Sequence, residues 1–216
     1  MSGRLVALML GLSSLAFAPL APHAAEAPPP SALLIENVHV FDGTAERRSP
    51  RTLRVLVEGN RITRISADAI QAPDGARVID GGGRTLMPGL IDSHTHLMLA
   101  GPGLLESMTG DPAYLGLRAA EMAEAMLMRG FTSVRDVGGP VFGLRRAIEE
   151  GRIPGPRIFP SGAMVSQTGG HGDFRLPSDI PRADGAPLHH TETSGAAAIA
   201  DGEAEVLRRV REQLMM

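Results

Sequence analysis

The sequence of 216 residues predicts an α/β fold, in which a small β segment precedes strands that alternate with helices. Two observations predict it. From residue 31 to residue 87 the chain consists of short apolar runs separated by Gly, Asn and Asp, which is typical of strands joined by turns. After residue 88, short apolar strands alternate with segments of helical periodicity, a pattern that implies right-handed βαβ units and a parallel sheet.

The first segment, residues 31–87, is expected to form a small β-sandwich or half-barrel. Residues 53–58 (LRVLVE) and 61–65 (RITRI) are separated by the turn-forming pair Gly59 and Asn60, which indicates a β-hairpin. Further strands are expected at residues 33–41, 77–80 and 85–86.

The second segment, residues 88–216, is expected to contain about three strand–helix units. Its first long helix begins at the cap residue Asp111, has Pro112 in its first turn and ends at Gly130. The other elements are expected as strands 90–94, 131–135 and 157–159 and helices 142–150 and 201–214.

Composition excludes several classes of protein. The chain has no Cys, which excludes a disulfide-stapled miniprotein and a Cys-based zinc or iron–sulfur site. All 21 basic residues are Arg, so no mechanism within these residues can use a lysine. A net charge of −3 provides no basic field for a phosphate backbone, and we expect no nucleic acid partner.

The amino terminus has the order of a secretory signal peptide, with Arg4 before a mainly apolar run at residues 5–20 and small residues after it. We predict a signal peptide over residues 1–25, removed after Ala24 or Ala25, and a linker over residues 26–32. The apolar run is shorter than the ~20 residues of a spanning helix, which favours removal over a stable membrane anchor. An uncleaved anchor or a buried helix is the alternative. The mature protein is expected to be exported, either periplasmic or secreted.

Two histidines at the end of the first strand after residue 88 are the main candidates for chemistry. Side chains alternate along a strand, so His94 and His96 leave from one face and Thr95 from the other. Two neutral imidazoles can share a cation such as zinc. An H-x-H pattern alone is weak, because two histidines on a strand are more often structural or surface residues.

The sequence around this pair is more specific. The run MPGLIDSHTHL at residues 87–97 resembles the first barrel strand of the amidohydrolase superfamily of metal-dependent hydrolases. The resemblance extends over roughly residues 33–173. It includes residues 130–136 (GFTSVRD) and residues 166–173 (SQTGGHGD), which look like the second strand and the third-strand loop of the imidazolonepropionase-like branch. That branch includes exported Xaa-Pro dipeptidases.

This resemblance implies a partial TIM (β/α) barrel over residues 88–216, with the family's small β-sandwich before it. It also implies hydrolysis of a carbon–nitrogen bond, in an amide, a cyclic amide or a dipeptide, by a metal-activated hydroxide. His94 and His96 would be ligands of the more buried metal. The cofactor would be divalent, with zinc favoured and one or two ions in the complete protein. The partner would be a small molecule or dipeptide, and the oligomeric state stays open.

The remaining candidates have weaker signals. His171, in a Gly-rich loop, is similar to a residue that could contact the substrate in this branch, with an exposed loop histidine as the alternative. Arg135 and Asp136 end the second strand, where a buried Arg–Asp pair that holds the loop is favoured over catalysis. The sequence assigns no catalytic residue. The other histidines are expected outside any site: His23 in the leader, His39 on a half-exposed strand, and His189 and His190 as a solvated pair.

The length sets a limit on function. A complete barrel takes ~250 residues, and residues 88–216 amount to about half of that. The resemblance implies further ligands, among them a carboxylated lysine, two histidines and a late aspartate, that have no matching positions here. We therefore predict an amino-terminal fragment that is truncated and inactive. The alternative is a non-catalytic fragment or binding remnant of the same fold.

Overall fold

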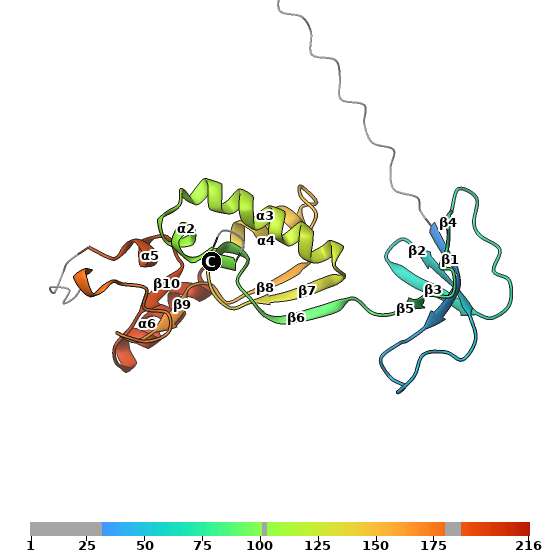
Figure 1. Cartoon of the computed structure of the whole chain (residues 1–216), viewed down its shortest axis with the longest axis horizontal. Coiled ribbons are helices and arrows are strands. Elements are labelled where there is room, and N and C mark those ends of the chain that lie inside the picture. The colour runs from blue at the N-terminus through green and yellow to red at the C-terminus, as the bar shows by residue number, and fades with distance from the viewer. Residues whose placement is uncertain (1–31, 101–102, 180–186) are drawn as a thin grey trace, which may run out of the picture. The chain divides into compact units, whose positions relative to one another are not determined.

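The computed structural model describes residues 32–100, 103–179 and 187–216 (Figure 1). These residues form two compact units, one that contains residues 47–86 and the strand before them, and one that contains residues 87–216. The predicted signal peptide, and all of the predicted linker except Ala32, lie outside the described residues. In the part that is described, no helix is long and apolar enough to cross a membrane.

The first unit is a five-stranded sheet in the order β3-β2-β1-β4, with β5 paired to β1. β2 and β3 are antiparallel and joined at Gly59, which has a φ of +58°, so the predicted hairpin is confirmed. The buried side chains of this unit include Leu34, Leu56 and Ile70. The strands pair in one connected sheet, and the β-sandwich stays a prediction. Their bounds are β1 Ala32–Val40, β2 Leu53–Glu58, β3 Arg61–Ser66, β4 Arg77–Asp80 and β5 Thr85–Leu86.

The second unit contains the predicted alternation of strands and helices. Three strands form a parallel sheet in the order β6-β7-β8, which confirms the α/β class and the expected parallel pairing. The elements from β6 to β8 are β6 Leu90–Thr95, α1 Leu97–Ala100, α2 Leu104–Thr109, α3 Pro112–Met128, β7 Phe131–Asp136, α4 Phe142–Glu149 and β8 Arg157–Pro160.

Helix α3 begins where the sequence predicts. The Asp111 side chain accepts hydrogen bonds from the backbone N–H groups of Ala113 and Tyr114 and thereby caps the helix. One face of α3 is buried in the main core, in which Leu115 and Ala119 join Val134 of β7. Figure 1 shows α3 and α4 lying over one face of the parallel sheet.

The opposite face of the sheet has no such cover among the described residues. Ile91 of β6 is 73% exposed and Phe159 of β8 is 55% exposed. In a parallel sheet with helices on both faces, the strands would be buried on both sides. This open face is relevant to function because the predicted site residues lie at the carboxyl ends of its strands.

The region after β8 differs from the prediction of a Gly-rich loop followed by one helix. A second, two-stranded parallel sheet pairs residues that lie more than thirty positions apart, for example Ala197 with Met164. Each strand has only three residues, so alternation along the sequence cannot identify it. The elements of this region are β9 Met164–Ser166, the 3₁₀ helix Pro177–Asp179, α5 His190–Thr193, β10 Ala197–Ile199 and α6 Glu203–Leu214.

Substitution of Leu115 by alanine tests the main core. Leu115 is 6% exposed in α3, and Leu115→Ala should lower the free energy of unfolding by about 2–5 kcal/mol because it removes buried methyl groups and leaves a cavity. Leu117, on the same helix, is 72% exposed, and Leu117→Ala should change stability by less than about 0.5 kcal/mol. Urea unfolding followed by far-UV circular dichroism measures both. Equal losses for the two variants would contradict this packing.

Candidate functional site

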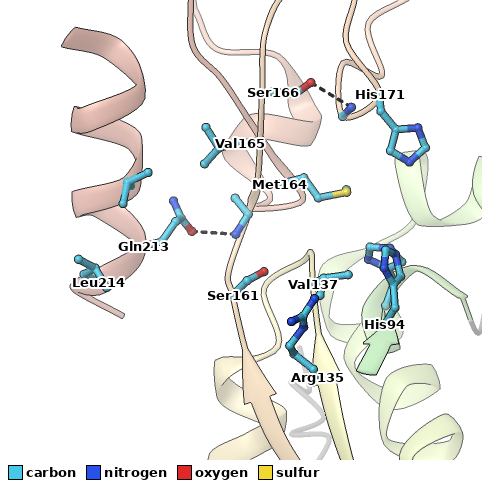
Figure 2. A pocket seen from close by; sticks show the side chains of 14 residues that line it. His94, Arg135, Val137, Ser161, Met164, Val165, Ser166, His171, Gln213 and Leu214 are labelled. Atoms are coloured by element: carbon cyan, nitrogen blue, oxygen red, sulfur yellow. Dashed lines mark hydrogen bonds between the residues drawn. The ribbon is translucent and has the colours of Figure 1, made fainter. Parts of the chain in front are cut away.

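A pocket of about 490 Å³ lies in the second unit beyond the carboxyl ends of the parallel strands (Figure 2). It brings together three of the histidines that the sequence singles out, His94, His96 and His171. The other lining residues come from the ends of β7 and β8, from β9 and its loop, and from α6: Arg135, Val137, Ser161, Ala163, Met164, Val165, Ser166, Gly172, Val210, Gln213 and Leu214.

The strand geometry places both His94, in β6, and His96, just after it, at this pocket. The ring centroids of His94 and His96 are 5.3 Å apart and the ring planes cross at 80°. Thr95, between them, is buried, as the alternation of side chains along a strand requires. Asp92 accepts a hydrogen bond from the His94 backbone N–H at 3.0 Å, which fixes the backbone just before the pair. The pair is therefore a preformed feature of the strand end.

The orientation of His96 depends on a buried carboxylate in the next strand. Asp136 is fully buried and accepts the backbone N–H of Leu97 at 2.7 Å and that of Gly138 at 3.2 Å. His96 Nδ1 lies 3.3 Å from the carbonyl oxygen of the same Gly138. A ring nitrogen that meets a carbonyl oxygen must carry the proton, which leaves Nε2 as the electron-pair donor of His96.

Burial raises the pKa of the Asp136 carboxyl above its ordinary value, although the N–H groups of Leu97 and Gly138 and the nearby His96 favour the charged form. The expected buried Arg135–Asp136 pair is wrong. Arg135 points from the other side of β7 and lines the pocket as an exposed side chain. Asp136 holds the loop through backbone N–H groups instead, because residues that follow one another on a strand face opposite sides.

His171 is held at the pocket by a network within its loop. Arg175 donates to both carboxylate oxygens of Asp173, from Nε and from Nη2, each at 2.7 Å. The two side chains are only 6% and 3% exposed. Asp173 also accepts the backbone N–H of Gly169, and Arg175 reaches the Thr168 hydroxyl. A bidentate ion pair of this kind fixes a loop more firmly than a single hydrogen bond, so His171 has a defined position.

Helix α6 forms the far wall of the pocket, opposite His171 and His94 (Figure 2). None of its residues is buried. Polar bonds attach it instead: the Gln213 side chain accepts the backbone N–H of Ala163 at 2.8 Å, and Arg209 pairs with Glu192 at 2.9 Å. The sequence predicts the helix but gives no signal that it lines a site, since its partners lie far away in the chain.

Three of the histidines that the structure describes lie outside the pocket. His189 is not part of a solvated pair, because its side chain caps α5 and lies 2.9 Å from the Thr191 hydroxyl. His190 is the first residue of that helix. His39 is half-buried in β1, with its ring nitrogen 2.7 Å from the Ser49 carbonyl oxygen.

The pocket supplies part of a metal site. His94 and His96 provide two imidazoles, which suit zinc and other borderline cations. Catalytic zinc sites have three protein ligands, and the described residues contain no group of three or more His, Asp and Glu side chains that could hold a metal ion. The donor chemistry of the pair therefore fits a divalent metal, while the number of ligands within the described residues falls short. The role of both histidines as ligands stays a prediction.

The chain is similar to proteins that are already known. The model of the amidohydrolase family matches residues 85–215. Ochratoxinase of Aspergillus niger is 39% identical over 136 residues, which is 60% of this chain and 28% of that protein. The structure of an amidohydrolase is 38% identical, with a TM-score of 0.73 over 86% of this chain and 44% of the other. The structure of a prolidase complexed with N-methylphosphonate-L-proline is 36% identical, with a TM-score of 0.73 over 85% of this chain and 44% of the other. The chain thus spans less than half the length of each.

Removal of the Asp136 carboxylate should loosen the ends of β6 and β7. Asp136→Ala leaves two buried N–H groups without an acceptor, at a cost of about 1–3 kcal/mol for each. Asp136→Asn keeps one acceptor oxygen and should lose less. Urea unfolding measures the stability, and NMR hydrogen exchange of the Leu97 and Gly138 amides measures the local effect. Unchanged protection of both amides in Asp136→Ala would contradict this role.

The ion pair in the loop that carries His171 predicts the direction in which the pKa of Asp173 is shifted. Arg175 holds the pKa of the Asp173 carboxyl well below its ordinary value of 3.8. The folded pKa is lower than the unfolded one, so the carboxylate stabilises the loop above pH 3.8, and this contribution is lost as the pH falls below that value. Carbon-13 NMR of the Asp173 carboxyl should give a midpoint below 3.8.

Arg175→Gln should move that midpoint upward, because it removes the cation that stabilises the charged form. Arg145→Gln is the matched control, since Arg145 pairs with Glu149 on α4 and touches neither Asp173 nor its loop. An upward shift of the same size in both variants would rule out the ion pair as its cause.

Proposed function

The chain belongs to the amidohydrolase family, and from that premise we propose that it is the metal-binding amino-terminal part of a hydrolase of carbon–nitrogen bonds. The observation that carries the proposal is the His94–His96 pair, two imidazoles 5.3 Å apart that line one pocket. A divalent cation bound there would lower the pKa of a water molecule and polarise the bond to be cleaved.

The arrangement of the strands supports this function. We propose that β6, β7 and β8 are the first three strands of a TIM barrel and that the first unit is the family's β-sandwich. The active sites of TIM-barrel enzymes lie at the carboxyl ends of the strands. His94 and His96 lie at that end of β6, and Arg135 lies near the end of β7.

Each pocket residue has a role in this proposal. His94 and His96 would hold the metal, which we propose to be zinc because imidazole nitrogen and borderline cations suit each other. Asp136 keeps the His96 ring oriented through the Gly138 loop. His171 would contact the substrate, which we propose to be a small amide or a dipeptide. The similarity to a prolidase complexed with a phosphonate derivative of proline supports the dipeptide.

The chain on its own is proposed to be inactive. Two imidazoles are one ligand short of the three protein ligands usual in a catalytic zinc site. The chain spans 28% of the length of the ochratoxinase and 44% of that of the prolidase. The two-ligand pocket equally favours a second candidate, a binding remnant that holds a metal or small molecule without turnover. We also propose export to the periplasm or the medium, from the composition of residues 1–25.

Zinc titration of the purified chain tests the metal site. Isothermal titration calorimetry should detect weak binding of one zinc ion, and His94→Ala or His96→Ala should abolish it because one imidazole cannot hold the ion. His190→Ala is the matched control, since His190 lies on α5 outside the pocket, and it should bind zinc as the unchanged chain does. Zinc binding that survives both pocket variants would refute the site.

The same sample tests the inactivity. With zinc present, hydrolysis of leucyl-proline, followed by the release of free proline, should not exceed the rate without protein. Turnover that disappears in His94→Ala would show that the chain is an active hydrolase as it stands.

A further inference from the structure

We propose that Arg135 is the anion-binding residue of this pocket and that it takes the carboxylate of a small ligand with an apolar body. The inference deepens the proposed function, on which it rests for the presence of a substrate in the pocket. It names the chemical class of that substrate and the residue that selects it.

The charges of the pocket lining favour an anion. Among the lining residues that the structure describes, Arg135 carries the one permanent charge and none is Asp or Glu. An arginine stays protonated at all physiological pH values. A concave site with a fixed positive charge and no carboxylate attracts negatively charged ligands.

The Arg135 guanidinium is free to bind. Its neighbour Asp136 faces the helices and gives its two oxygens to Leu97 and Gly138. Within the residues that the structure describes, the Arg135 side chain has no ion pair or hydrogen bond, and it is exposed. Charged side chains that line a pocket without a partner commonly fix the orientation of a ligand. The guanidinium presents paired N–H donors, which match the two oxygens of a carboxylate.

The position of Arg135 in the sheet directs it to the open face. It pairs in register with Phe159 of β8, which is 55% exposed, whereas the adjacent Val134 is fully buried under the helices. The strand alternation thus sends Arg135 to the face that leads to the histidines. Figure 2 shows Arg135 and His94 on neighbouring strands at the same end of the pocket.

The opposite wall of the pocket is apolar. Val165 of β9 and Val210 and Leu214 of α6 line it, whereas the Met164 side chain points toward the histidines (Figure 2). Val165 is 38% and Val210 42% exposed, so both present surface that a ligand could cover. The nearby Gln213 amide oxygen already accepts from Ala163 and adds little polar character. A ligand that spans the pocket therefore meets a cation at one side and hydrocarbon at the other.

These features describe the carboxylate of an N-acylated amino acid or dipeptide with an apolar side chain. The volume of about 490 Å³ is of the size that holds a small ligand. Such a ligand would place its carboxylate on Arg135 and its apolar body against β9 and α6. The amide bond would then lie between these two ends, beside the histidines.

Calorimetric titration of the full chain in EDTA tests the proposal without metal or turnover. The probes are N-acetyl-L-leucine and its uncharged amide, N-acetyl-L-leucinamide. The acid should bind in the millimolar range and the amide at least about tenfold more weakly, because only the acid pairs with the guanidinium. Equal affinity for the two probes, or no binding of the acid up to about 10 mM, would overturn the proposal.

Variants locate the effect. Arg135→Gln should weaken binding of the acid about tenfold or more and leave binding of the amide unchanged. Arg135→Lys should give an intermediate loss, because lysine keeps the charge but lacks the paired N–H donors of the guanidinium. Arg211→Gln, which removes the same charge from an exposed position on α6 outside the pocket, is the matched control and should bind as the unchanged chain does. Far-UV circular dichroism confirms that each variant is folded.

An unaltered affinity for the acid in Arg135→Gln would also overturn the assignment. Because EDTA is present throughout, these results do not depend on zinc binding. Failure of the zinc titration would therefore count against the metal site, and failure of the probe titration would count against the anion site.

Discussion

The buried carboxylate of Asp136 is the constraint on which the candidate site depends. It closes the carboxyl ends of β6 and β7 together by accepting the N–H of Leu97, just after one strand, and that of Gly138, just after the other. The Gly138 carbonyl oxygen then meets the ring of His96. A buried group with unmet hydrogen bonds would be costly, so these contacts hold one another in place. The position of His96 is thus fixed by Asp136, a residue on the side of the sheet that the helices cover.

Much of the fold follows from local sequence patterns. The cap at Asp111, the spacing of apolar residues in α3 and the turn at Gly59 each act over a few residues, and the structure confirms the elements that they predict. The pairing of β9 with β10 could not be predicted in this way. Its strands have three residues each, and Ala197 and Ala198 are buried and pair with residues distant in sequence. The sequence does not predict the role of His189 as a helix cap for a related reason, since α5 has only four residues.

The residues of the candidate site likewise differ in whether a local sequence pattern predicts them. His94 and His96 could be found from the sequence because a strand repeats every two residues, and the run around them carries a family resemblance. For Arg135 the sequence predicts the wrong partner, because Asp136 is its neighbour in the chain, whereas the strand turns the two side chains to opposite faces. The wall formed by α6 had no local signal. Gln213 reaches Ala163 across fifty positions of chain, and only the folded structure shows that contact.

The attachment of α6 has a consequence for the shape of the pocket. Because none of its residues is buried, α6 is held to the rest of the unit by little apolar contact. A few polar bonds, such as Gln213 to Ala163 and Arg209 to Glu192, attach it instead. Segments with few buried apolar contacts open at a smaller free energy than the core they rest on. We therefore expect the α6 side of the pocket to open at a smaller free energy than the side that carries the histidines. Under the proposed function, the histidines that would hold the metal and the helix that would limit the size of the ligand thus lie on different walls of the pocket.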